Sequence, residues 1–66
     1  MKIVINGNEK EINEKINLKQ IIEQFCRNNR HIIAEVNGTI IKSPQWEGKT
    51  IRSGDTIELV NFVGGG

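Results

Sequence analysis

The residues best suited to chemistry are three glycines at the end of the chain, Gly64, Gly65 and Gly66. They directly follow an apolar run, Leu59–Val63. Glycine has no side chain to bury and loses the most conformational entropy on ordering, so these residues contribute little to a core. They form a slender end that can enter a channel too narrow for a Cβ atom. We therefore expect any chemistry to take place at the terminal carboxylate of Gly66.

An inert tail is the alternative interpretation of the same residues. Chain ends are usually poorly ordered, and short glycine runs also occur as linkers or as remnants of gene fusion. The choice depends on the domain that carries the glycines and on whether that domain offers a catalytic group of its own.

The rest of the sequence offers no catalytic set. Cys26 is the only cysteine and His31 the only histidine, and a nucleophilic pair would need them in contact. Cys26 falls on the apolar stripe of an expected helix, where cysteine behaves as a small hydrophobic residue. One cysteine and one histidine do not make a metal site, and Gly64–Gly66 have no following helix to form a phosphate loop. We expect no catalytic residue and no bound metal.

Composition excludes several classes of partner. Nine basic and eight acidic residues are interspersed and give a net charge of +1, and the only aromatic residues are Phe25, Trp46 and Phe62. Nucleic-acid binding would require a basic patch or a stacking surface. The single cysteine excludes an internal disulfide, and no apolar run approaches the ~20 residues that span a membrane. The first residues also lack the pattern of a signal peptide. We expect a cytoplasmic protein without nucleic-acid or membrane partners.

The opening residues predict a strand and a hairpin. Met1, Ile3 and Ile5 recur with the period of two that is typical of a strand with one buried face. The Asn6–Gly7 pair that follows is a strong signal for a two-residue hairpin turn. We expect Lys10–Ile16 to return as a polar edge strand, whose charges discourage pairing with other chains.

The period then becomes helical. Five apolar residues share one stripe at helical spacing, namely Leu18, Ile21, Ile22, Phe25 and Cys26. Asn17 is suited to cap the start of this helix, and we expect the helix to end near Asn28–Asn29.

Strand periodicity returns in the second half of the chain. Residues 32–36 alternate, and Asn37–Gly38 predicts a second hairpin that leads into residues 39–42. Pro44 suits the first position of a short helical turn, which we expect to bring Trp46 back onto the core.

A tight turn at Ser53–Asp55 and a last strand over Thr56–Phe62 complete the domain. The elements predict an α+β fold, a mixed sheet of four to five strands with one helix packed across one face. The first and last strands should be parallel neighbours in the middle. We expect the domain to cover residues 1–61 and a flexible tail to cover 62–66. The expected core consists of Ile3, Ile5, Leu18, Ile21, Ile22, Phe25, Ala34, Val36, Trp46, Ile51, Ile57 and Leu59.

The last strand also predicts an exposed apolar surface. If Ile57 and Leu59 face the helix, alternation turns Val60 to the opposite face, which no second helix covers. This surface would lie beside the glycine tail and suits docking of a partner that receives it. Scattered surface apolar residues are the alternative. The expected docking residues are Val4, Val60, Phe62 and Val63. Of these, Val4, Val60 and Phe62 would form one small apolar cluster beside the tail.

Five short motifs follow one another along the whole chain: Asn6–Gly7, Val36–Gly38, Pro44–Trp46, Gly54–Asp55 and Phe62–Gly66. In this order and spacing the chain resembles the ThiS sulfur carriers, members of the ubiquitin-like β-grasp proteins of the MoaD–ThiS family. The resemblance implies that the Gly66 carboxylate is adenylated and converted to a thiocarboxylate, with Gly64 and Gly65 threading into the partner.

The resemblance further implies three partners for thiamin biosynthesis. These are a ThiF-like adenylyltransferase that uses ATP and magnesium, a sulfur donor such as a cysteine desulfurase, and a ThiG-like thiazole synthase. The chain itself would then be a carrier rather than an enzyme and would bind no cofactor. A MoaD-like carrier for molybdopterin synthesis, a carrier for another pathway, and a β-grasp interaction module with an inert tail are the alternatives.

Overall fold

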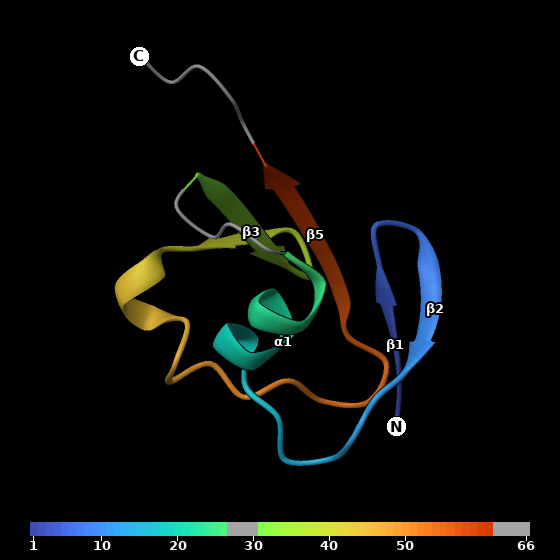
Figure 1. The fold of residues 1–66 in the computed structure, drawn as a ribbon. Coiled ribbons are helices and arrows are strands. Elements are labelled where there is room, and N and C mark those ends of the chain that lie inside the picture. Colours follow the sequence, from blue (N-terminus) through green and yellow to red (C-terminus); the bar gives the residue numbers. More distant parts are fainter. Residues whose placement is uncertain (27–30, 62–66) are drawn as a thin grey trace.

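A computed structural model describes residues 1–26 and 31–61 of the chain. In this part, five strands form one sheet and a single α-helix, α1, crosses one face of it (Figure 1). The elements are β1 (Lys2–Ile5), β2 (Asn8–Glu11), α1 (Leu18–Phe25), β3 (Ile32–Val36), β4 (Thr39–Ile41), the 3-10 helix η1 (Ser43–Gln45) and β5 (Thr56–Asn61).

The strand order across the sheet is β2-β1-β5-β3-β4. β1 and β5 pair in parallel, whereas the β1–β2, β3–β4 and β3–β5 pairs are antiparallel. The first and last strands of the chain are therefore neighbours, and β5 is the central strand. The predicted mixed sheet with one helix on one face is confirmed.

Both predicted hairpin turns are present, and both have the backbone that an Asn-Gly pair favours. Asn6 and Gly7 have φ angles of 50° and 82°, and Asn37 and Gly38 have φ angles of 53° and 87°. Two consecutive residues with positive φ match the right-handed twist of the flanking strands. The turns therefore fix the registers Ile5–Asn8 and Val36–Thr39.

Helix α1 begins as the sequence predicts and ends earlier. The Asn17 side chain accepts a hydrogen bond from the Gln20 N–H at 2.8 Å, and the Gln20 side chain accepts one from the Asn17 N–H at 2.9 Å. This reciprocal capping box satisfies two amide donors at the helix start. Cys26 leaves the helix in an extended conformation, so Phe25 lies on the last turn and is 41% exposed. The prediction that Phe25 belongs to the core is wrong.

The predicted return strand over Lys10–Ile16 is also shorter than expected. β2 ends at Glu11, and Lys15, with a φ of 61°, lies in a non-regular turn before the helix. Ile16 is consequently 5% exposed and accepts a hydrogen bond on its carbonyl from the Ile51 N–H at 3.0 Å. The chain between β2 and α1 thus contributes a core residue rather than an edge strand.

The core lies between α1 and the facing side of the sheet. Trp46 covers one margin of it at 6% exposure, and its indole N–H donates a hydrogen bond to the Ile41 carbonyl at 2.8 Å. The other predicted core residues are buried, with Ile16 and Ile32 in addition. The core consists of Ile3, Ile5, Ile16, Leu18, Ile21, Ile22, Ile32, Ala34, Val36, Trp46, Ile51, Ile57 and Leu59.

Candidate functional site

The central strand β5 leads directly into the predicted reactive end of the chain. β5 is described as far as Asn61, with β1 on one side and β3 on the other (Figure 1). Five of the predicted site residues lie outside the described residues, so their roles remain predictions: Phe62, Val63, Gly64, Gly65 and Gly66.

Two turn asparagines bind β5 through their side chains. Asn6 Oδ1 accepts a hydrogen bond from the Leu59 N–H at 2.8 Å, and Asn37 Oδ1 accepts one from the Thr56 N–H at 2.9 Å. Each asparagine also donates its own backbone N–H to a β5 carbonyl. Both residues lie in a turn with positive φ at the end of a strand. Their side-chain oxygens therefore give β5 one acceptor each, in addition to the hydrogen bonds that their backbone N–H groups donate. The two hairpins are thereby attached to the strand that carries the chain end.

Asp55 holds the second of these asparagines in place. Its Oδ1 accepts a hydrogen bond from Asn37 Nδ2 at 3.0 Å, and its Oδ2 accepts one from the Arg52 N–H at 2.8 Å. A carboxylate that closes a turn through a nearby backbone N–H is typical of aspartate. The start of β5 is therefore fixed by a network of side chains and backbone groups, and the expected role of Asp55 in a turn is confirmed.

The two faces of β5 differ as predicted from alternation. Ile57 is fully buried and Leu59 is 8% exposed beneath α1, whereas Val60 is 52% exposed on the opposite face. No described helix covers that face.

The expected neighbour of Val60 on this face is not the observed one. Val4 pairs with Thr56 at the beginning of β5, four residues from Val60. At about 3.3 Å per residue that separation is roughly 13 Å along the strand. The prediction that Val4 and Val60 lie side by side is wrong, because the register of the parallel pair places Val4 at the far end.

Val60 instead lies opposite Ile33 of β3. Ile33 is 39% exposed, and Ile40 on the next strand is 59% exposed. We call Ile33, Ile40 and Val60 the outer patch. Glu35 is paired with both Glu58 and Ile40, so a row of two carboxylates borders the patch. Sequence reasoning missed Ile33 and Ile40, although alternation within β3 and the Asn37–Gly38 turn were available signals.

The remaining chemically active side chains, Cys26 and His31, are not part of the outer patch. Cys26 is half-buried and packs against the core, and this burial raises the pKa of its thiol, which disfavours the nucleophilic thiolate. His31 is exposed and directly precedes β3. Among residues 1–26 and 31–61, no group of three or more His, Cys, Asp or Glu side chains is placed to hold a metal ion. No helix in the same ranges is long and apolar enough to cross a membrane.

The fold is shared with solved structures of a thiamine biosynthesis protein (ThiS) from Geobacter metallireducens. The crystal structure superposes with a TM-score of 0.87 at 23% sequence identity and covers the whole of both chains. The solution structure gives a TM-score of 0.81 at 23% identity and covers all of this chain and 88% of that chain. These superpositions confirm the predicted β-grasp fold.

Sequence relatives extend over nearly the whole chain. An uncharacterized protein ycf40 of Trieres chinensis is 37% identical over 62 residues, which are 94% of this chain and 85% of the relative. A thiazole synthase of Paramagnetospirillum magneticum is 29% identical over 66 residues. That match covers all of this chain but only 20% of the synthase.

The family model of the ThiS proteins matches residues 3–66, so the match includes both the sheet and the glycine end. It agrees with the motifs read along the sequence and with the superposed structures. The chain belongs to the ThiS family.

Proposed function

We propose that this chain is a sulfur carrier and that its reactive group is the carboxylate of Gly66. Membership in the ThiS family supports the carrier role, and the match through residue 66 is the observation that carries the proposal, because it includes the terminal glycines. In this proposal the Gly66 carboxylate becomes a thiocarboxylate, and its sulfur is used to form the thiazole ring of thiamin.

The chemistry requires activation of an unreactive group. A carboxylate is a poor electrophile, so its oxygen first attacks the α-phosphorus of ATP and displaces pyrophosphate. The resulting acyl-adenylate carries AMP as a good leaving group, and a persulfide on the sulfur donor attacks the carbonyl carbon and releases AMP. A thiol then cleaves the acyl disulfide so formed, which leaves the thiocarboxylate and a disulfide with the donor cysteine. ATP and magnesium would be bound by a ThiF-like adenylyltransferase, and a cysteine desulfurase would supply the sulfur. This chain would contribute the carboxylate and not the catalytic groups.

The thiazole synthase relative supports a ThiG-like protein as the sulfur acceptor. A segment similar to this whole chain makes up a fifth of that protein. A carrier-like segment joined to a thiazole synthase favours thiamin over molybdopterin as the destination of the sulfur. All of these partners would meet the carrier in the cytoplasm.

The outer patch is the surface that we propose for partner docking. Ile33 and Val60 are paired near the end of β5, so a partner that covers them is close to the point at which the chain continues into residues 62–66. Exposed apolar residues that gather near a reactive group are typical of interaction sites. The border of Glu35 and Glu58 would orient a partner that presents basic side chains to it.

An intact mass tests the chemistry. The chain is incubated with ATP and magnesium, a ThiF-like enzyme, a cysteine desulfurase, cysteine and a thiol reductant. We expect a mass increase equal to the replacement of one oxygen by one sulfur. Deletion of Gly66 should abolish the increase, and Gly65→Leu should slow it by blocking the channel, while both variants keep the melting temperature. An unchanged mass with a partner set that thiolates a known carrier would refute the proposal.

Two charge substitutions test the docking surface. Val60→Asp should raise the KM of the adenylyltransferase for the carrier, because it places a carboxylate in the outer patch. Val4→Asp is the matched control, because Val4 lies on β1 opposite Thr56, at the other end of β5 from Val60. If the two variants raise KM equally, the docking surface includes Val4, as the sequence predicts; if neither does, this face is not the docking surface. Thermal unfolding of both variants separates docking from stability.

A further inference from the structure

The two free edges of the sheet differ in how they are protected from pairing. β2 forms one edge and carries the sequence Asn-Glu-Lys-Glu over Asn8–Glu11, with every residue exposed. Charged side chains of this kind discourage an edge strand from pairing with another chain. β4 forms the other edge and carries only Thr-Ile-Ile, with Ile40 at 59% exposure. The three residues of β4 therefore carry none of the charge that protects β2, although Lys42 follows them directly.

The register of the second hairpin shows which backbone groups this edge presents. Val36 and Thr39 flank the two-residue turn, so they exchange both ladder hydrogen bonds. Bonding alternates along an antiparallel pair, so Ile41 also bonds inward to Ala34. The N–H and C=O of Ile40, between them, consequently point away from β3 toward the open edge.

The first hairpin shows the same alternation in recorded bonds. Four residues beyond the Ile5–Asn8 pair that closes that turn, Met1 and Ile12 exchange both bonds, at 2.7 and 2.9 Å. The rule that assigns an outward amide to Ile40 therefore holds elsewhere in this sheet.

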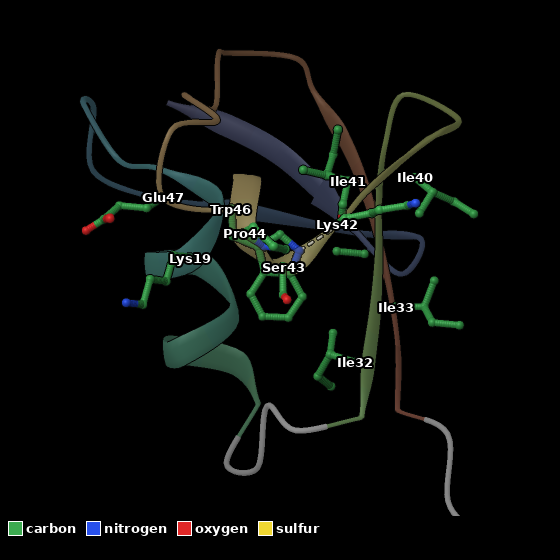
Figure 2. Close-up of a pocket in the computed structure, with 11 residues that line it drawn as sticks. Lys19, Ile32, Ile33, Ile40, Ile41, Lys42, Ser43, Pro44, Trp46 and Glu47 are labelled. Atoms are coloured by element: carbon green, nitrogen blue, oxygen red, sulfur yellow. Dashed lines mark hydrogen bonds between the residues drawn. The ribbon is translucent and has the colours of Figure 1, made fainter. Parts of the chain in front are cut away.

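A groove adjoins the end of β4. The strand ends at Ile41, the chain turns into η1, and a groove of about 700 Å³ remains beside β3. In Figure 2 the side chains of Ile33, Ile40 and Lys42 lie on one side of β3, while Trp46 and Pro44 lie on the other side. A strand paired with β4 would continue over this groove, so its side chains would meet apolar surface next to a lysine.

A positive charge directly follows β4, on Lys42, while the carboxylates near this edge are Glu35, opposite Ile40 on β3, and Glu47, which lines the groove. The ion pair recorded among the described residues joins the Met1 ammonium to Glu11, so the Lys42 ammonium is not paired with a described carboxylate. Lys42 follows Ile40 by two residues, which places both on the same face of an extended chain. An apolar side chain and a carboxylate with the same spacing on a facing strand complement this arrangement.

We propose that the β4 edge binds an extended segment of a partner protein as a sixth strand, antiparallel to β4. The segment has an apolar residue opposite Ile40 and an acidic residue two positions before it, opposite Lys42. Strand addition supplies main-chain hydrogen bonds for affinity and alternate side chains for specificity. Antiparallel pairing is the more common orientation in sheets. The proposal does not depend on thiocarboxylate chemistry, because it concerns backbone groups of β4.

A capped peptide, acetyl-Ser-Asp-Thr-Ile-Thr-Ser-amide, tests the proposal against the ¹⁵N-labelled full chain by NMR. We expect saturable shifts of the amides of residues 39–42 and slower hydrogen exchange at Ile40. A peptide with Lys in place of Asp should bind severalfold more weakly to the natural chain. It should regain binding to the Lys42→Glu variant, because the charges are then exchanged.

Two substitutions of Ile40 distinguish the contribution of its backbone amide to peptide binding from the contribution of its side chain. Ile40→Pro removes an amide that points outward, a change that edge strands tolerate, and it also shortens the apolar side chain. The variant should fold and lose peptide binding. Ile40→Thr keeps the amide and should retain weakened binding. Binding by Ile40→Pro equal to that of the natural chain, or peptide-induced shifts confined to other residues, would overturn the proposal. Shifts of the Ile40 amide that depend on protein concentration without peptide would assign the edge to a second copy of this chain instead.

Discussion

The hydrogen bond from the Leu59 N–H to Asn6 Oδ1 should be one of the more valuable polar contacts in this small domain. It joins residues 53 positions apart and is partly buried. Asn6→Gly removes the acceptor and keeps a residue that tolerates the φ of 50°. A buried donor left without a partner costs about 1–3 kcal/mol. We therefore expect Asn6→Gly to lower the free energy of unfolding by that amount.

Two further variants of Asn6 distinguish the stability that comes from the hydrogen bond from the stability that comes from the backbone conformation. Asn6→Ala loses the same acceptor and adds the cost of a left-handed residue with a Cβ atom, about 1 kcal/mol more. Asn6→Asp keeps an acceptor oxygen and tolerates the turn, so its stability should remain within about 0.5 kcal/mol of the natural chain. The matched control is Asn8→Ala, whose side chain makes only a long exposed contact of 3.5 Å with the Asn6 carbonyl.

Thermal and urea unfolding measure these differences. For a domain of this size, each kcal/mol lowers the melting temperature by about 4–8 °C. Asn6→Gly and Asn6→Ala should also show faster hydrogen exchange at the Leu59 amide, whereas Asn6→Asp should not. If Asn6→Gly unfolds at the same temperature as the natural chain, the side-chain bond adds no stability and the reasoning is wrong.

Three other changes probe the remaining packing and charge. Ile21→Ala, at a fully buried helix position, should lower the free energy of unfolding by about 2–5 kcal/mol, measured with urea. Phe25→Ala, at 41% exposure, should lower it clearly less. Equal losses would show that Phe25 belongs to the core. Trp46→Phe should cost about 1–3 kcal/mol in thermal unfolding, because the Ile41 carbonyl loses its indole donor at 2.8 Å, and an unchanged stability would show that water replaces the donor. The N-terminal ammonium, 2.8 Å from Glu11, holds the pKa of that carboxyl below its usual 4.5, so the stability that Glu11 adds should be present above that value and lost as pH falls through the lower pKa of the folded state. Melting temperatures of the natural chain and Glu11→Gln should therefore converge in acid, and a gap that widens in acid would contradict this account.

Local signals in the sequence predicted most of the fold. Asn17 and the stripe from Leu18 to Ile22 fixed the start and the buried face of α1. Asn-Gly pairs predicted both hairpins, because few residues adopt two consecutive positive φ angles. The end of the helix was not predictable in this way. Phe25 has the right spacing for the apolar stripe of the helix. Spacing alone, however, does not show how far along the helix the rest of the domain covers this stripe.

The candidate site was less predictable, because it depends on register between strands that are distant in sequence. Alternation placed Val60 on the exposed face but not beside a particular neighbour. The register of the parallel β1–β5 pair places Val4 opposite Thr56, away from Val60. The register of the antiparallel β3–β5 pair places Ile33 opposite Val60. At the candidate site, the Asn37–Gly38 turn allows one register to be read from the sequence, and it places Ile40 beside Glu35.

The parallel pairing of the first and last strands also determines how the domain responds to force. A pull on the end of β5 against the start of β1 acts along both strands, so their hydrogen bonds are loaded together in shear. In an antiparallel hairpin such as β1–β2, a pull on the two open ends would instead break the bonds one after another. The Asn6 side chain adds a load-bearing contact to β5 beyond the end of β1. Because forced unfolding is governed by the rate of unfolding, this arrangement should make the domain mechanically resistant to a pull on the end of β5.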